Sequence, residues 1–323
     1  MPSLTRRALL AAALLAVTGA AQAQAWPTKP IKIIVPFGAG GIVDTLARTT
    51  GTKVTGYTGQ PVIVENRLGA GGNIGGEAVA KADPDGHTLL LTAGNVMAAN
   101  QYLYAQMPFD ATTAFAPVSL LADMPLALAV PADSPAKDLA ELIAYAKREQ
   151  GKLFYSSPGV GTSIHLAVES LQQATGTSMQ HVAYKGALEA VTAVITSQAN
   201  MIFADLPLVL PQIRAGKLRA IAVAGNARIP QLPDTPTIAE GGIKGFGASS
   251  WFGLAAPAKT PRATIDLINA AFVRALREPD VQKPFLDLGA KLVGNTPDQF
   301  AAFVVQERER YGALTKAAGI KPQ

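Results

Sequence analysis

The sequence IKIIVPFGAGGIVD, at residues 31–44, passes from an apolar β-branched stretch into a glycine-rich loop and then into a helical pattern. A strand, a tight loop and a helix in this order are typical of a parallel α/β sheet. Short β-rich stretches, each followed by a glycine or proline and then by a helical pattern, recur along the rest of the chain. The sequence therefore predicts the α/β class.

The same alternation predicts the individual elements. After a first strand at 31–35, we expect strands at residues 62–65, 88–92, 118–121, 126–130, 153–156, 201–204, 218–224 and 251–255. Apolar residues at three- and four-residue spacing predict helices at 43–54, 73–82, 136–149, 163–174 and 188–197. From Pro261 onward the pattern is helical, and Thr296 and Pro297 mark the start of the last helix.

The chain is long enough for two domains, because its 323 residues exceed the roughly 250 to 300 at which single cores usually stop growing. Proline-containing segments at 122–125 and 229–247 bracket the second set of strands. We therefore expect the chain to leave a first lobe, build a second and return, so that two crossings form a hinge. The predicted boundaries are 26–124 and 246–323 for lobe 1 and 125–245 for lobe 2.

Composition excludes several classes of protein. Hydrophobic residues make up 49% of the chain and charged residues 16%, which is enough apolar surface for a folded core. The formal charge of +5 falls to +3 once Arg6 and Arg7 are set aside with a leader, and no basic stripe remains, so nucleic-acid binding is disfavoured. The absence of cysteine excludes disulfides, thiolate catalysis, thiolate metal sites and a lipid anchor on cysteine.

The first residues have the pattern of a secretory signal peptide. Arg6 and Arg7 precede an apolar run at 8–17, which is too short for a membrane-spanning helix, and small residues follow up to Ala25. We predict a signal peptide at residues 1–25, with cleavage after Ala23 or Ala25. The paired arginines leave both Sec and twin-arginine export open. The mature protein is expected in the periplasm.

The glycine-rich loop after the first strand is a candidate anion site. Glycines let successive backbone N–H groups turn inward, and the following helix start adds a partial positive charge. A tight turn whose glycines serve only packing is the alternative. We expect Asp44 to act as the helix N-cap rather than as a base.

A second loop of the same design precedes another predicted helix, at residues 157–165. Ser157, Thr162 and Ser163 offer hydroxyl groups there, although serine and threonine at a helix start are usually caps. His165 follows and has either a packing or a ligand-binding role. One such loop from each lobe suggests a clamp around a ligand.

Sequence motifs for cofactors and common catalytic sites are missing. None of the glycine clusters completes G-x-G-x-x-G, and the chain has no G-x-x-x-x-G-K-[ST], H-E-x-x-H or G-x-S-x-G. The three histidines, His87, His165 and His181, are too scattered in sequence to specify a metal site. We therefore expect no cofactor and no metal.

Eight motifs together resemble a known family. They are WP-x-KPI at 26–31, VPFGAGG-x-x-D at 35–44, VENR-x-GAGG at 64–72, DPDG-x-T at 83–88, YKG at 184–186, AGKLR at 215–219, LPD-x-PT-x-x-E at 232–240 and W-x-GL-x-AP at 251–257. The sequence resembles the periplasmic substrate-binding receptors of tripartite tricarboxylate transporters, often called Bug receptors. The resemblance covers essentially the whole mature chain.

The resemblance implies a type II periplasmic-binding fold, with two α/β lobes that close on a small carboxylate. It implies that the two loops hold one ligand carboxylate, while Asn95 and Asp205 contact the distal part of the ligand. The candidate ligand-binding residues are Phe37, Gly38, Ala39, Gly40, Gly41, Asp44, Asn95, Ser157, Gly161, Thr162, His165, Ala204 and Asp205. The implied partners are a large and a small membrane subunit of the transporter, and we expect a monomer.

Two departures from the family pattern bear on the ligand. Val43 stands where threonine is frequent, and residues 197–200 read SQAN where GQVD is usual. An inward carboxylate at Asp205 would also repel a second ligand carboxylate. We therefore expect an amino acid, a monocarboxylate or a carboxylate with a polar tail.

Two other functions compete with ligand capture for transport. An enzyme would need Asp44, His165 and Asp205 to form an acid–base set in the cleft between the lobes. A ligand-sensing receptor for a membrane sensor kinase would share the fold and the pocket. We expect a binding protein and no enzyme, and the sequence does not separate uptake from sensing.

Overall fold

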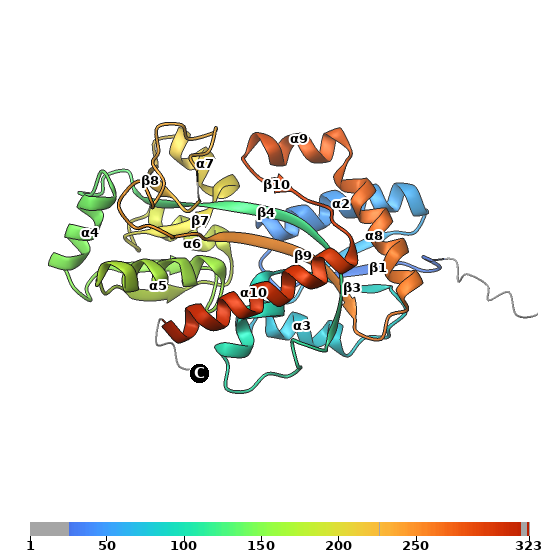
Figure 1. The fold of residues 1–323 in the computed structure, drawn as a ribbon. Helices are drawn as coiled ribbons and strands as arrows, with labels where there is room; N and C mark the ends of the chain where they lie inside the picture. The colour runs from blue at the N-terminus through green and yellow to red at the C-terminus, as the bar shows by residue number, and fades with distance from the viewer. Residues whose placement is uncertain (1–25, 226, 318–321, 323) are drawn as a thin grey trace, which may run out of the picture.

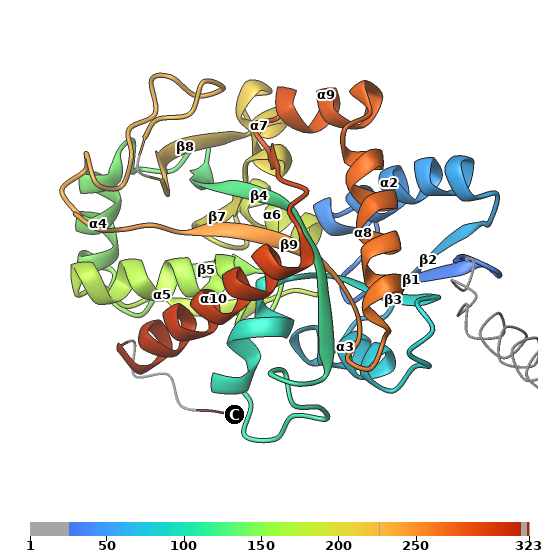
Figure 2. The same cartoon turned by 45° about the vertical axis from the view of Figure 1, so that its right-hand side comes forward.

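The fold consists of two α/β lobes joined by two strands that run through both (Figure 1). The computed structural model describes residues 26–225, 227–317 and 322, so the predicted leader and its cleavage sites lie outside the described residues. Strands β4 (Phe115–Pro131) and β9 (Ser249–Pro257) pair antiparallel and pass side by side from one lobe into the other (Figures 1 and 2). The predicted α/β class and two-lobe architecture are confirmed.

Lobe 1 is built on a sheet with the order β10-β4-β9-β3-β1-β2, in which β1 is parallel to β2 and β3. Its other strands are β1 (Ile31–Val35), β2 (Val62–Asn66), β3 (Thr88–Ala93) and β10 (Lys291–Leu292). Its helices are α2 (Ile42–Thr58), α3 (Asn73–Ala80), α8 (Arg262–Leu276), α9 (Pro279–Asp287) and α10 (Pro297–Ala317). Short helical turns at Ala70–Gly72, Asn95–Ala99 and Asn100–Tyr102 complete it.

Lobe 2 uses the other half of β4, which pairs antiparallel with β7 (Ile202–Asp205) and β8 (Leu218–Val223). A parallel pair, β5 (Phe154–Ser157) and β6 (Gln180–Ala183), lies beside β7 through a bridge between Tyr155 and Met201. The helices are α4 (Leu139–Arg148), α5 (Ser163–Thr175), α6 (Ala187–Ile195) and α7 (Leu206–Arg214).

Separate hydrophobic cores stabilise the two parts. One cluster of buried side chains draws its members from residues 126–246, and two others draw theirs almost entirely from the chain before and after that segment. The helices of the described residues are all too short or too polar to span a lipid bilayer. The lobe boundaries given above stay a prediction.

Several elements differ from the sequence prediction, and no strand was expected at β6 or β10. The strands expected at 118–121 and 126–130 are one strand, because β4 continues through Pro125, which pairs with Ser249 of β9. The pairing of β4 with β9 shifts register earlier, between Pro117 and Ser119 and between Leu120 and Ala122. Helix α7 was not predicted, since Pro207 and Pro211 interrupt its pattern. Pro207 lies in the first turn, where an N–H has no partner within the helix, and is therefore tolerated.

Helix α10 fastens the crossing strand β9. The Trp251 indole nitrogen donates to Glu307 Oε2 at 2.7 Å, and the ring meets Phe300 and Phe303 edge-on. Gly253 lies under the same helix, where a Cβ atom would come within 2.1 Å of Phe300 Cζ. The close approach of β9 to α10 therefore requires glycine at position 253.

We expect Gly253→Ala to lower the free energy of unfolding by about 1–3 kcal/mol, because the added methyl group overpacks the contact with Phe300. Gly56→Ala is the matched control. Gly56 lies inside α2, and an added methyl group there would have no atom within 4 Å, so alanine should stabilise the protein by up to about 1 kcal/mol. Urea unfolding measures both, and equal midpoints for the two variants would contradict the packing.

Candidate ligand-binding site

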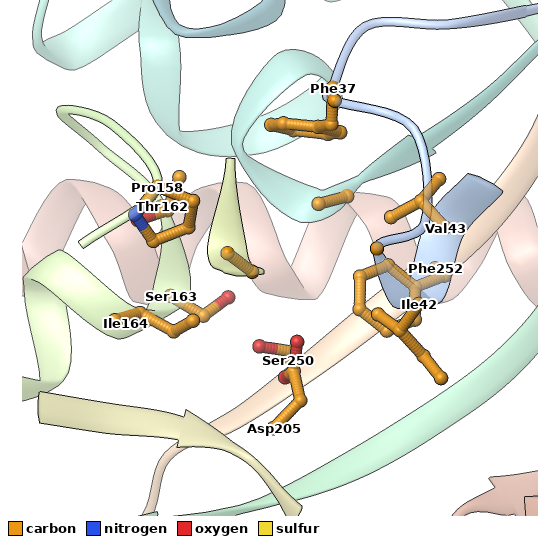
Figure 3. Close-up of a pocket in the computed structure, with 14 residues that line it drawn as sticks. Phe37, Ile42, Val43, Pro158, Thr162, Ser163, Ile164, Asp205, Ser250 and Phe252 are labelled. Carbon is orange, nitrogen blue, oxygen red and sulfur yellow. The ribbon is translucent and has the colours of Figure 1, made fainter. Parts of the chain in front are cut away.

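A pocket lies between the lobes, where the loops after β1 and β5 meet (Figure 3). Both lobes and the crossing strand β9 supply its walls. The lining residues are Phe37, Gly38, Gly41, Ile42, Val43, Ala93, Pro158, Thr162, Ser163, Ile164, Ala187, Asp205, Ser250 and Phe252. Its volume of about 40 Å³ is room for about three water molecules. The pocket is therefore suited to a ligand of a few heavy atoms.

Three helices begin at this pocket. Ile42 and Val43 are the first residues of α2, Ser163 and Ile164 begin α5, and Ala187 begins α6. N–H groups in a first helical turn have no partner within the helix, and the helix dipole adds positive potential there. No lysine, arginine or histidine lines the pocket among the described residues. The three helix starts therefore favour an anion through backbone groups rather than through side-chain cations.

Asp44 holds the first loop from behind and does not line the pocket. Helix α2 begins at Ile42 after Gly41, so the prediction that Asp44 is the N-cap was wrong. Its carboxylate accepts from Gly40 N at 2.9 Å and from Arg48 Nε and Asn66 Nδ2 at 3.0 Å each. Burial acts to raise the pKa of the Asp44 carboxyl, but the bonds from Arg48, Gly40 and Asn66 outweigh it and lower the pKa. Asp44 therefore shapes the loop as a bonded anion.

A stack of aromatic rings supports the second loop. The ring centroid of His181 lies 4.2 Å from that of His165 and 4.9 Å from that of Tyr155. His165 Nδ1 accepts the Gly161 N–H at 3.2 Å, and the Ser157 hydroxyl lies 2.6 Å from His181 Nε2. The two histidines therefore fix the backbone of the loop from its inner side.

Both histidines of the stack are neutral at ordinary pH. Burial, with a smaller contribution from the neighbouring His181, lowers the pKa of His165 to about 3. Burial lowers the pKa of His181 to about 4. Since neither histidine lines the pocket, and Asp44 does not either, the acid–base set of an enzyme is not assembled there.

Asn95 lies behind a different part of the cleft. It is fully buried, and its side-chain amide donates to Gly71 O and, at 3.4 Å, to Asn100 Oδ1. Asn100 in turn donates to Asn73 Oδ1 at 2.6 Å. This amide network holds the glycine loop that precedes α3, and Asn95 does not line the pocket.

The predicted site residues fall into two groups. Those that line the pocket are Phe37, Gly38, Gly41, Thr162 and Asp205. Those that do not are Ala39, Gly40, Asp44, Asn95, Ser157, Gly161, His165 and Ala204. Gly40 N and Gly161 N already donate within their own loops, to Asp44 and His165. Contact of any of these residues with a ligand stays a prediction.

Nine lining residues are absent from the predicted set. Ile42, Val43, Pro158, Ser163 and Ile164 belong to the two predicted loops and their helix starts, and Ala93 ends β3. The other three come from motifs that sequence reasoning did not connect with the pocket. Ala187 follows the Tyr184-Lys185-Gly186 motif, whose glycine is the N-cap of α6. Ser250 and Phe252 flank Trp251 on β9. Their motifs were visible in the sequence, but only the pairing of β9 with β4 brings them to the pocket.

The two lobes touch each other around the pocket. A Cβ atom at Gly186 would lie 3.6 Å from Gly38 Cα, so the backbones of the two lobes meet there. A Cβ atom at Gly161 would lie 2.4 Å from Leu103 Cδ1, and one at Gly40 would lie 3.1 Å from Leu188 Cδ1. The structure is therefore closed, and glycine at these contacts is what permits closure.

The family of the chain follows from comparison with known proteins. A family model described as the tripartite tricarboxylate transporter family receptor matches residues 46–320. The chain belongs to this family. It is 38% identical to a protein encoded in the tcbD-tcbE intergenic region of Pseudomonas sp. strain P51, over 96% of this chain and 93% of that one. It is 36% identical to the protein BugT of Bordetella pertussis, over 93% and 92% of the two chains.

Solved structures of receptors of this family share the fold. The periplasmic binding protein BugD matches with a TM-score of 0.88 and 33% identity, over 92% of this chain and all of that one. A protein of R. palustris solved with adipate matches with a TM-score of 0.88 and 32% identity, over 92% and 100% of the two chains. The Rhodopseudomonas palustris protein MatC, solved with malate, matches with a TM-score of 0.86 and 32% identity, over 90% and 99%.

The neutral histidines predict that acid destabilises the fold. Their folded-state pKa values lie below the ordinary value of about 6.5, so the unfolded chain binds more protons, and stability present above about pH 6.5 is lost as pH falls. Burial raises the pKa values of Asp205 and Asp123, so over part of the same pH range these two carboxyl groups stabilise the fold as pH falls. We expect the free energy of unfolding to fall less between about pH 7 and pH 5 in His181→Phe than in the wild type.

Urea unfolding of both proteins at the two pH values measures this difference. Phenylalanine keeps an aromatic ring in contact with Tyr155 and His165 but has no site for a proton. An equal loss of stability in the two proteins would contradict a buried, neutral His181.

Proposed function

We propose that this chain is a periplasmic receptor that captures a small carboxylate, an organic acid or an amino acid, by lobe closure and delivers it to the large and small membrane subunits of a tripartite transporter. The convergence of three helix starts from two lobes on one pocket carries the proposal. Relatives of the same family solved with adipate and with malate support it.

Closure follows from where the backbone donors lie. The start of α2 belongs to one lobe, and the starts of α5 and α6 belong to the other. A carboxylate can accept from both sets only when the lobes are together, so it binds the closed state more tightly and shifts the population toward it. The closed form is then the one that a membrane partner recognises.

The cellular setting is part of the proposal: the family and the predicted leader at residues 1–25 support export, and cleavage after Ala23 or Ala25 would leave the mature chain in the periplasm. We propose a monomer that works without a cofactor and without catalysis. The second candidate, presentation of the closed form to a membrane sensor kinase, uses the same pocket.

Binding is tested on protein that has been unfolded and refolded to remove ligand, against mono-, di- and tricarboxylates, amino acids and aromatic acids. A ligand that binds only the folded state with micromolar affinity should stabilise it by roughly 4 kcal/mol at millimolar concentration, which raises the melting temperature. No shift with any carboxylate would contradict the proposal. Loss of uptake of the identified ligand on deletion of the gene supports transport, whereas unchanged uptake favours the sensor.

Closure is tested by Gly161→Val. We expect affinity for the identified carboxylate to fall at least about tenfold, because the side chain would collide with Leu103 and hold the lobes apart. Gly176→Val is the control, since Gly176 has a similar left-handed conformation, φ +65° against +81°, but no atom within 4 Å of an added Cβ. Calorimetric titration of both measures the effect, and equal affinities in the two variants would contradict the clamp.

A further inference from the structure

Asp205 has a carboxylate oxygen that no described residue satisfies. The residue ends β7 and is the N-cap of α7, and only 3% of its surface is exposed. An aspartate at an N-cap usually accepts a backbone N–H of its own helix, but the Asp205 side chain makes no such bond. Its Oδ1 atom is buried without a hydrogen-bond partner among the described residues. The side chain faces the pocket instead (Figure 3).

No cationic side chain among the described residues faces Asp205 in the pocket. Burial raises the pKa of Asp205 to about 6, and among the described residues the Ser250 hydroxyl acts against this rise. The carboxylate is therefore mainly ionised at neutral pH. A buried charge that is neither paired nor fully hydrogen-bonded is costly. A ligand that brings a cationic donor would remove this cost.

Two hydroxyl groups line the same pocket as the Asp205 carboxylate. The oxygen atoms of Ser163, Asp205 and Ser250 gather on one side of the pocket, and we call this group the oxygen corner (Figure 3). Ser163 Oγ also lies 3.0 Å from the Tyr311 hydroxyl. A hydroxyl oxygen has two acceptor lone pairs, so Ser163 can accept from both Tyr311 and a ligand. The corner thus offers acceptors from three side chains.

The chemistry of the oxygen corner fits an ammonium group. An ammonium carries three N–H donors and a positive charge, whereas an alcohol carries one donor and no charge, and an ionised carboxylate carries no donor. The rest of the polar wall is made by the starts of α2, α5 and α6, which suit a carboxylate. The pocket therefore has one subsite that suits an anionic group of the ligand and another that suits a cationic group.

We propose that the ligand of this receptor is a small amino acid, held by its carboxylate at the three helix starts and by its ammonium group at the oxygen corner. This inference rests on the proposed function, the capture of a carboxylate. Asp205 determines specificity, because a dicarboxylate would place a second negative charge against it, while an ammonium neutralises it.

Matched ligands test the proposal. Alanine, lactate and propionate share one carbon skeleton, and aspartate, malate and succinate share another. Each set contains an amino acid (alanine or aspartate) and the matching hydroxy acid (lactate or malate). In whichever set binds, calorimetric titration of refolded protein near neutral pH should show at least about tenfold tighter binding of the amino acid than of the hydroxy acid. Asp205→Asn should remove this preference, because the amide keeps the size of the side chain but loses its charge.

Asp123→Asn is the matched control variant. Asp123 also has a buried oxygen without a described partner, but it lies outside the pocket. The preference for the amino acid should therefore survive in Asp123→Asn. A preference lost equally in both variants would overturn the assignment to Asp205.

A measurement on the wild type covers the case in which Asp205→Asn does not fold. A cation bound to the Asp205 carboxylate lowers its pKa, so binding near pH 6 should release about half a proton with the amino acid and none with the hydroxy acid. Titration in buffers of different ionisation enthalpy measures this number. Equal proton release for the two ligands would overturn the proposal.

The two proposals fail in distinguishable ways. If hydroxy acids or dicarboxylates bind as tightly as their amino counterparts, the amino-acid assignment is overturned and carboxylate capture stands. If no carboxylate of any kind binds, the proposed function itself fails.

Discussion

Backbone N–H groups without partners inside their own helices determine what this pocket does. Helices α2, α5 and α6 begin at one small pocket, and they come from opposite lobes. In the proposed function, a single carboxylate satisfies donors on both sides only when the lobes are closed, so binding and closure are coupled. The glycine contacts around the pocket, such as Gly38 against Gly186, let the two backbones come that close.

The charged and polar residues that first suggest catalysis instead hold these loops in place. Asp44 is bonded to the loop backbone and to Arg48, and His165 accepts a backbone N–H while neutral. Asp205 is different, because it is buried and ionisable, lines the pocket, and has one carboxylate oxygen without a hydrogen-bond partner among the described residues. Asp44 already has its hydrogen bonds within the protein, whereas Asp205 keeps an oxygen available to a ligand in the pocket.

The sequence predicted the features that depend on local pattern. The strand at 31–35, the glycine loop and the helix after it are all present, because β-branched runs and glycine breaks act within a few residues. It did not predict the continuity of β4, the proline-containing helix α7 or the place of Ser250, since each depends on pairing or packing with distant chain. Asp44 was misassigned for a smaller reason: α2 begins slightly earlier than its apolar pattern indicated.

The decisive measurement is the crystal structure of the refolded protein with its identified ligand. We expect carboxylate oxygens within about 2.7–3.2 Å of first-turn nitrogens of both α2 and α5, directly or through one water, with the lobes closed. A ligand carboxylate paired instead with a side-chain cation such as Lys185, or bound to one lobe alone, would contradict this expectation.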